Sequence, residues 1–268
     1  MGRIEATFRR LHSSGEKALI PFITAGDPDL ATTEQLIHTL VEAGADVIEL
    51  GVPFSDPMAD GPTIQAASER ALQGGATLAK ILQLVTRVRE HTNVPIVLMG
   101  YYNPVFRYGA ERFARDAAAA GVDGVLLVDL PPEEAGELTD ALRAADLRLI
   151  TLLAPTTPPQ RRRRLAEVGE GYLYYVSMTG VTGVQGVDAG AIEADVTALR
   201  SISPVPVAVG FGITSPQDAA AVGRFADAVV VGSALVRIIE ACGGSDRLLP
   251  EVKAFTAALK EGLRRTAA

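Results

Sequence analysis

Two of the carboxylates in the sequence VIELGVPFSDPMADGPTIQ, residues 47–65, stand where they could do chemistry. Glu49 lies within a run of hydrophobic residues, and Asp60 ends a proline-rich loop just before Pro62. Burying an unpaired carboxylate costs several kcal/mol or raises its pKa, so an acid in an apolar run is typical of general acid–base chemistry. The structural alternatives are a hydrogen bond to a neighbouring strand for Glu49 and capping of a helix that starts at Pro62 for Asp60.

A third acid and a group of tyrosines also stand where they could reach a site. Asp129 ends an apolar run in VDLPP, where it could line a pocket or hold a loop. Strand alternation puts Tyr172 and Tyr174 on one face and Tyr175 on the other, so one face can present a phenol. Most strand tyrosines, however, are packing residues.

Three glycine-containing turns lie late in the chain: MTGVTG (178–183), GFGIT (210–214) and GSA (232–234). Glycines let backbone N–H groups approach an anion, and the N-terminus of a following helix adds positive charge. These turns therefore predict a phosphate site held mainly by neutral donors. The best candidates are Gly212, Gly232 and Ser233, followed by Gly183.

Eight apolar runs alternate with helical stretches and must position these groups. The runs are 18–24, 46–52, 95–101, 124–130, 148–154, 172–178, 206–212 and 227–233. Each is nearly continuous in hydrophobic residues, as expected of parallel strands buried on both faces. Capping pairs predict where three of the helices begin: Thr32 with Gln35, Thr157 with Gln160, and Ser215 with Asp218.

This alternation predicts an α/β fold, a single (β/α)₈ TIM barrel over residues 1–268. Extra helices are expected at 3–14 and, after the eighth strand, at 233–241, with a closing helix at 245–265. An open doubly wound sheet and two small domains are the alternatives. The first lacks an early GxGxxG motif.

Composition limits the possible partners. The net charge of −7 and the pI near 5.1 argue against nucleic acid and anionic membranes. The arginines at 161–164 are expected to form a solvated helix face. No long apolar segment is present, which favours the cytoplasm, and His12, His38 and His91 are too scattered to predict a metal site.

Six motifs together resemble the tryptophan synthase alpha subunit family. They are FITAGDPD (22–29), ELGVPFSDPMADGPTIQ (49–65), MGYYNPVF (99–106), SMTGVTG (177–183), VGFGI (209–213) and VVGSA (230–234). The resemblance runs over the whole chain in the right order. It implies a (β/α)₈ barrel that cleaves indole-3-glycerol phosphate into indole and glyceraldehyde 3-phosphate by a retro-aldol reaction.

The resemblance also implies roles for individual residues. Glu49 corresponds to the proton donor to indole C3, Asp60 to the acceptor of the indole N–H, and Tyr174 to the active-site tyrosine. The indole-side residues would be Phe22, Ile64, Met99 and Asp129, and the phosphate-side residues Gly183, Phe211, Gly212, Gly232 and Ser233. Thr182 would hydrogen-bond to Asp60 when the loops at 53–61 and 178–190 close. The second loop departs from many relatives after GVTG, where it reads VQGVDAG and contains no arginine.

The resemblance further implies a partner and leaves alternatives open. Family members dock onto a beta subunit in an alpha2beta2 heterotetramer, and the segments at 53–57 and 103–108 match the docking face. Pyridoxal phosphate is expected in the beta subunit, and no cofactor is expected in this chain. The alternatives are a stand-alone lyase that releases free indole and a non-catalytic activator of a beta subunit. A metal-dependent sugar-phosphate epimerase fails because the required histidines are missing at the strand ends.

Overall fold

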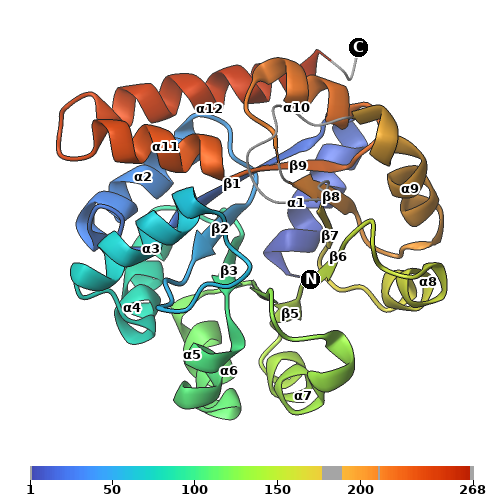
Figure 1. Cartoon of the computed structure of the whole chain (residues 1–268), viewed down its shortest axis with the longest axis horizontal. Helices are drawn as coiled ribbons and strands as arrows, with labels where there is room; N and C mark the ends of the chain where they lie inside the picture. Colours follow the sequence, from blue (N-terminus) through green and yellow to red (C-terminus); the bar gives the residue numbers. More distant parts are fainter. Residues whose placement is uncertain (1, 177–188, 211, 266–268) are drawn as a thin grey trace.

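The structure is a computed structural model that describes residues 2–176, 189–210 and 212–265. Its strands form a parallel sheet enclosed by helices, as Figure 1 shows. The strands are β1 (Ala18–Thr24), β2 (Ile48–Gly51), β3 (Ile96–Gly100), β4 (Gly124–Leu127), β5 (Arg148–Leu149), β6 (Thr151–Leu153), β7 (Leu173–Val176), β8 (Val207–Gly210) and β9 (Ala228–Val231). Their order is β5-β4-β3-β2-β1-β9-β8-β7-β6.

The fifth predicted strand is divided into two, which corrects the prediction of eight continuous strands. β5 pairs with β4 and β6 pairs with β7, so the two halves lie at opposite ends of the strand order. Ile150 joins them, and its N–H donates to Val125 O at 2.8 Å. One chain segment thus borders both ends of the sheet and brings them together into the predicted barrel.

The helices cover the outside of this barrel. They are α1 (Arg3–Ser14), α2 (Leu30–Glu42), α3 (Pro62–Gln73), α4 (Leu78–Arg89), α5 (Tyr102–Tyr108), α6 (Ala110–Ala120), α7 (Gly136–Ala144), α8 (Pro159–Glu167), α9 (Ala189–Ile202), α10 (Pro216–Gly223), α11 (Ser233–Cys242) and α12 (Leu248–Arg264), with a 3₁₀ turn η1 at Pro132–Glu134. The predicted extra helices before the first strand and after the last are confirmed. No helix in the described part of the chain has both the length and the apolar character needed to cross a membrane.

Helix α1 closes the N-terminal end of the barrel. Its buried side chains Ile4, Phe8 and Leu11 pack in one cluster with the inward-facing strand residues, including Tyr172. Figure 1 shows α1 near the centre of the ring. Because this end is filled, a substrate site must lie at the opposite, C-terminal ends of the strands, as is usual for barrels.

Acidic residues at the N-terminal end tie neighbouring strands together. Each precedes one strand and accepts a hydrogen bond from the backbone of the strand beside it: Asp46 from Leu19 N at 2.9 Å, Asp123 from Ile96 N at 2.8 Å and Asp227 from Val207 N at 3.0 Å. Each also pairs with a basic side chain, such as Lys260 with Asp46 at 2.7 Å. These carboxylates therefore stabilise the end of the barrel away from the candidate site.

Two of the three predicted capping pairs are wrong. Helix α2 is capped by Asp29, whose side chain accepts from Thr32 N, and not by Thr32 itself. At α8 the N-cap is Pro158, with no capping side chain among the described residues, while Thr157 Oγ1 accepts from Ala154 N. The third pair is confirmed, because Ser215 and Asp218 form a complete capping box.

The arginines of α8 are less solvated than predicted. Arg161 and Arg164 both pair with Glu133, at 2.8 and 2.7 Å. Arg162 is half-buried and pairs with Asp195 at 2.6 Å. These ion pairs therefore also hold α8 against the neighbouring parts of the chain.

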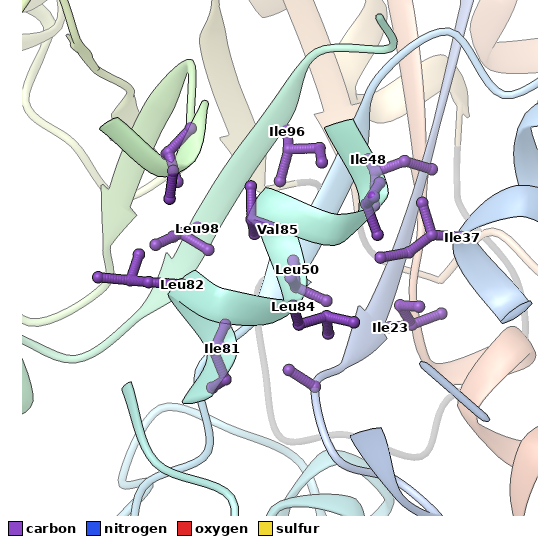
Figure 2. Packing of buried hydrophobic residues seen from close by; sticks show 14 of the residues in the cluster. Ile23, Ile37, Ile48, Leu50, Ile81, Leu82, Leu84, Val85, Ile96 and Leu98 are labelled. Carbon is purple, nitrogen blue, oxygen red and sulfur yellow. The ribbon is translucent and has the colours of Figure 1, made fainter. Parts of the chain in front are cut away.

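The outer face of the strands packs against the helices and thereby fixes which side chains point inward. Figure 2 shows Ile48 and Leu50 of β2 in a buried cluster with Ile37 of α2 and Val85 of α4. Side chains of a strand alternate between its two faces. Glu49, between these two residues, therefore points into the barrel interior.

Candidate active site at the C-terminal ends of the strands

Glu49 is a fully buried acid with one hydrogen-bond partner in the described part of the chain. In the strand register it lies between Phe22 of β1 and Val97 of β3. The Tyr172 hydroxyl donates to Glu49 Oε1 at 2.6 Å, whereas Oε2 is buried and has no partner among the described residues. Burial raises the pKa of Glu49 to about 8, although the Tyr172 hydrogen bond opposes this shift. At neutral pH the side chain is therefore mainly protonated and can donate a proton.

The three tyrosines of β7 and its approach face as alternation predicts. Tyr172 and Tyr174 belong to the interior cluster, and Tyr175 packs outside, where its hydroxyl donates to Asp195 at 2.7 Å. Burial and the nearby Glu49 raise the pKa values of Tyr172 and Tyr174, so both phenols stay neutral. The contact between Tyr172 and Glu49 is not apparent in the sequence. The available signal for it is the alternation that puts Tyr172 on the same strand face as Tyr174.

Asp60 does not cap the helix that follows it. The N-cap of α3 is Gly61, and no side chain in the described ranges hydrogen-bonds to it as a cap. The capping interpretation of Asp60 is therefore wrong. Its carboxyl group instead hydrogen-bonds to the hydroxyl of Tyr101, and burial raises its pKa to about 6. Asp60 is thus mainly ionised at neutral pH and can accept a hydrogen bond.

Asp60 shares a small cavity with apolar residues from three other elements. Phe22, Ile64 and Met99 line it together with Asp60, and the remaining lining residues are Thr24, Gly51, Val52, Ser68, Gly100, Tyr101 and Val128. Its volume is about 20 Å³, close to that of a single water molecule. A bicyclic ring can enter this place only if the side chains or the loop at residues 52–61 move. Glu49 lies next to the cavity, because its register partner Phe22 forms part of the wall.

The candidate phosphate residues follow β8 and β9 at the same end of the barrel. Gly212 has a φ of +74°, a conformation that favours glycine. Gly232 is the N-cap of α11 and Ser233, which is exposed, is its first residue. A Cβ at Gly232 would lie 3.5 Å from the Phe22 ring, so this turn borders the apolar wall of the cavity.

Comparison with known proteins identifies the family. The family model described as Tryptophan synthase alpha chain matches residues 8–264. The chain belongs to the tryptophan synthase alpha chain family. It is 57% identical over 263 residues to the tryptophan synthase alpha chain of Citrifermentans bemidjiense, with 98% of each chain covered. It is 56% identical over 263 residues to that of Geobacter sulfurreducens, covering 98% of this chain and 99% of that one.

Solved structures show the same barrel. The tryptophan synthase alpha subunit of Legionella pneumophila has a TM-score of 0.90 at 41% identity, with 99% of each chain covered. A chain of the aminoacrylate-bound tryptophan synthase of Mycobacterium tuberculosis has a TM-score of 0.88 at 36% identity, covering 98% of this chain and 100% of that one. The resemblance drawn from the motifs is thereby confirmed.

The remaining residues that the alpha chain resemblance named differ in what the structure says of them. Asp129 is exposed and is not among the lining residues of the cavity; its Oδ1 accepts from Tyr102 N at 2.7 Å, so it holds the start of α5. Its place in an indole pocket stays a prediction. Thr182, Gly183 and Phe211 lie outside the described residues. Within the described ranges, no cluster of three or more His, Cys, Asp or Glu side chains could hold a metal ion.

Proposed function

We propose that this chain is the alpha subunit of a tryptophan synthase and cleaves indole-3-glycerol phosphate into indole and glyceraldehyde 3-phosphate. The observation that carries the proposal is the buried carboxyl group of Glu49, one oxygen of which has no partner among the described residues, next to a cavity that holds a second acid, Asp60. Membership of the alpha chain family supports the same reaction.

Glu49 acts first as a general acid. Its proton passes to C3 of the indole ring, which becomes an electron-poor indolenine. The carboxylate formed keeps the hydrogen bond from Tyr172, which stabilises its new charge. Glu49 then accepts the proton of the hydroxyl group on the carbon next to the ring. That O–H electron pair forms the aldehyde carbonyl, the carbon–carbon bond breaks, and its electron pair restores the aromatic ring.

Asp60 stabilises the positive charge that develops on the ring. Its carboxylate accepts a hydrogen bond from the indole N–H while C3 is protonated. Phe22, Ile64 and Met99 supply the apolar walls against which the ring packs. Tyr174 completes the interior surface near Glu49, and Thr182 is expected to hydrogen-bond to Asp60 in a closed state.

The phosphate group binds to neutral donors at the ends of β8 and β9. Gly212 and Gly232 leave the backbone open to an anion, and Ser233 adds a hydroxyl at the N-terminus of α11. Gly183 and Phe211 are expected to complete this end of the site. The distance between the two ends is bridged by the glycerol chain of the substrate.

We further propose that the chain docks onto a beta subunit that carries pyridoxal phosphate, in an alpha2beta2 heterotetramer. Phe106, with 66% of its surface exposed, lies on one of the segments that match the docking face, and Met58, with 85% exposed, directly follows the other. Exposed apolar side chains of this size are typical of protein interfaces. No cofactor is assigned to this chain itself.

The decisive experiment measures indole formation from indole-3-glycerol phosphate with and without a beta subunit. Turnover by the wild type together with loss of turnover in Glu49→Gln and Asp60→Asn supports the proposal. An inactive wild type in complex with the beta subunit would refute it and favour a non-catalytic activator. High activity without the beta subunit, unchanged on adding it, would indicate a stand-alone lyase.

A further inference from the structure

Tyr101 lies where the barrel meets the loop that carries Asp60. It directly follows β3 and is the N-cap residue of α5. Its side chain is 4% exposed and lines the cavity together with Asp60. Nothing in the sequence alone distinguishes Tyr101 from a packing residue.

The hydroxyl of Tyr101 contacts two consecutive residues of the loop. Ala59 N–H donates to the Tyr101 oxygen at 2.9 Å. The Tyr101 hydroxyl is also hydrogen-bonded to the carboxyl group of Asp60. A phenol carries one hydrogen, and the bond from Ala59 does not use it, so Tyr101 can donate this hydrogen to Asp60. The direction of the second hydrogen bond is thereby fixed: Tyr101 donates and Asp60 accepts.

The ring of Tyr101 contacts the same loop at a third point. The Phe54 ring lies 5.3 Å from it, centre to centre, at an angle of 33°. Hydrogen bonds between backbone groups of this segment, such as Asp60 N to Pro57 O at 3.1 Å, stay within the loop. Gln65 of α3 donates from Nε2 to Asp60 O at 2.8 Å and links the segment to that helix. Within the described residues, the side chain of Tyr101 links residues 54–60 to the end of strand β3.

We propose that Tyr101 is a positioning residue that latches this loop onto the barrel and aims the carboxylate of Asp60 at the substrate. The proposal rests on the function proposed above. Met58 and Ala59 are exposed, so burial of the loop tip contributes little to holding it in place. The phenol supplies this restraint and favours the ionised form of Asp60, since it donates to the charged group.

The charged groups around this contact are few. Asp129, on the loop after β4, acts on the Tyr101 hydroxyl together with Asp60, and both carboxylates oppose ionisation of the phenol. Among the described residues, no cation is among the causes that shift the pKa of either Tyr101 or Asp60. The Tyr101 hydroxyl is thus the group that counteracts the effect of burial on Asp60.

The test is Tyr101→Phe, which keeps the ring and removes the hydroxyl. We expect kcat/KM for indole formation to fall about 10- to 100-fold, the loss for one hydrogen bond to a charged group. The acidic limb of the kcat/KM pH profile should move to higher pH, because Asp60 loses the donor that favours its ionised form. Wild-type kcat/KM with an unmoved acidic limb would overturn the positioning role.

Two control variants separate the hydroxyl from other effects. Tyr175→Phe removes a hydroxyl that donates to another carboxylate, that of Asp195, at 2.7 Å. Tyr175 packs outside the strands and does not line the cavity, so this variant should leave both readouts unchanged. Phe54→Leu weakens the ring contact but keeps both hydrogen bonds of Tyr101, so it should not move the acidic limb. A limb that moves equally in all three variants would overturn the proposal.

Hydrogen exchange tests the latch without relying on turnover. In Tyr101→Phe the Ala59 amide loses its acceptor and should exchange faster, whereas in Tyr175→Phe its exchange should be as in the wild type. An unchanged Ala59 amide in Tyr101→Phe would overturn the latch. If the wild type forms no indole, the proposed function fails, and the exchange experiment still decides whether Tyr101 holds the loop.

Discussion

Replacing Glu49 by glutamine should stabilise the protein at neutral pH while removing the proton that we propose it donates to the substrate. Burial raises the pKa of Glu49 from 4.5 to about 8, so between these values the unfolded chain releases a proton that the folded chain retains. Stability is therefore lost as pH rises through this interval, by about 1.4 kcal/mol for each pH unit. At pH 7 the accumulated cost is roughly 3 kcal/mol, and at pH 5 it is roughly 1 kcal/mol or less.

Glutamine has nearly the same shape and cannot ionise, so it avoids this cost. Its Oε1 can still accept from the Tyr172 hydroxyl. In glutamine, an amide NH₂ group takes the position of Glu49 Oε2, which carries the O–H of the protonated glutamate. This position has no partner among the described residues, whether it holds the O–H or the amide group. The change should therefore stabilise the fold by about 3 kcal/mol at pH 7 and by much less at pH 5.

The assay is urea unfolding of both proteins at pH 5 and pH 7, combined with indole formation at pH 7. Glu170→Gln is the matched control, because Glu170 pairs with Arg143 at 2.7 Å and accepts from Leu149 N, contacts that glutamine weakens. This control should not gain stability. If Glu49→Gln were no more stable than the wild type at pH 7, Glu49 would be ionised and paired in solution, and the reasoning would be wrong.

Three further predictions concern the same interior. As pH increases, kcat/KM should rise through about pH 6, as Asp60 ionises, and fall through about pH 8, as Glu49 loses its proton. A flat pH profile across this range would contradict the proposed roles of Asp60 as acceptor and Glu49 as proton donor. Tyr172→Phe removes the donor that lowers the pKa of Glu49, so the basic limb of the kcat/KM pH profile should move to higher pH. If this limb does not move, the hydrogen bond between Tyr172 and Glu49 is absent in the working enzyme. A Cβ at Gly210 would overlap the hydroxyl of Tyr174, so Gly210→Ala should destabilise the protein by about 1–3 kcal/mol in thermal or urea unfolding. Adding Tyr174→Leu to this variant should restore part of the lost stability. A Gly210→Ala variant as stable as the wild type would contradict the packing.

The barrel was predictable because its strands are continuous apolar runs and its helices begin after recognisable signals. The division of the fifth run into two strands was not predictable, because Arg148 and Thr151 gain different partner strands only once β4 and β7 are both in place. The predicted start of α2 is wrong for a local reason, because Asp29 and Thr32 are both acceptable capping residues and lie three positions apart. Which one caps the helix depends on the preceding loop.

The candidate acids were found more easily than their partners. Glu49 stands out because a lone carboxylate interrupts an apolar run, and its position does not depend on any distant residue. Tyr172 is 123 residues away from it in sequence, and Tyr101 is 42 residues away from Ala59. A tyrosine in or beside a strand looks the same whether it packs or donates to an acid, so neither contact could be inferred before the strands were arranged.

The arrangement gives the two carboxyl groups of the candidate site different protonation states near neutral pH. Each acid has a tyrosine hydroxyl as its partner, and each partner favours the ionised form. The difference between them is therefore depth: Glu49 lies inside the barrel on a rigid strand, whereas Asp60 lies at the edge on a loop. Burial dominates for the first and raises its pKa to about 8, but shifts the second only to about 6. Between these two values, the strand holds a proton donor and the loop presents a charged acceptor.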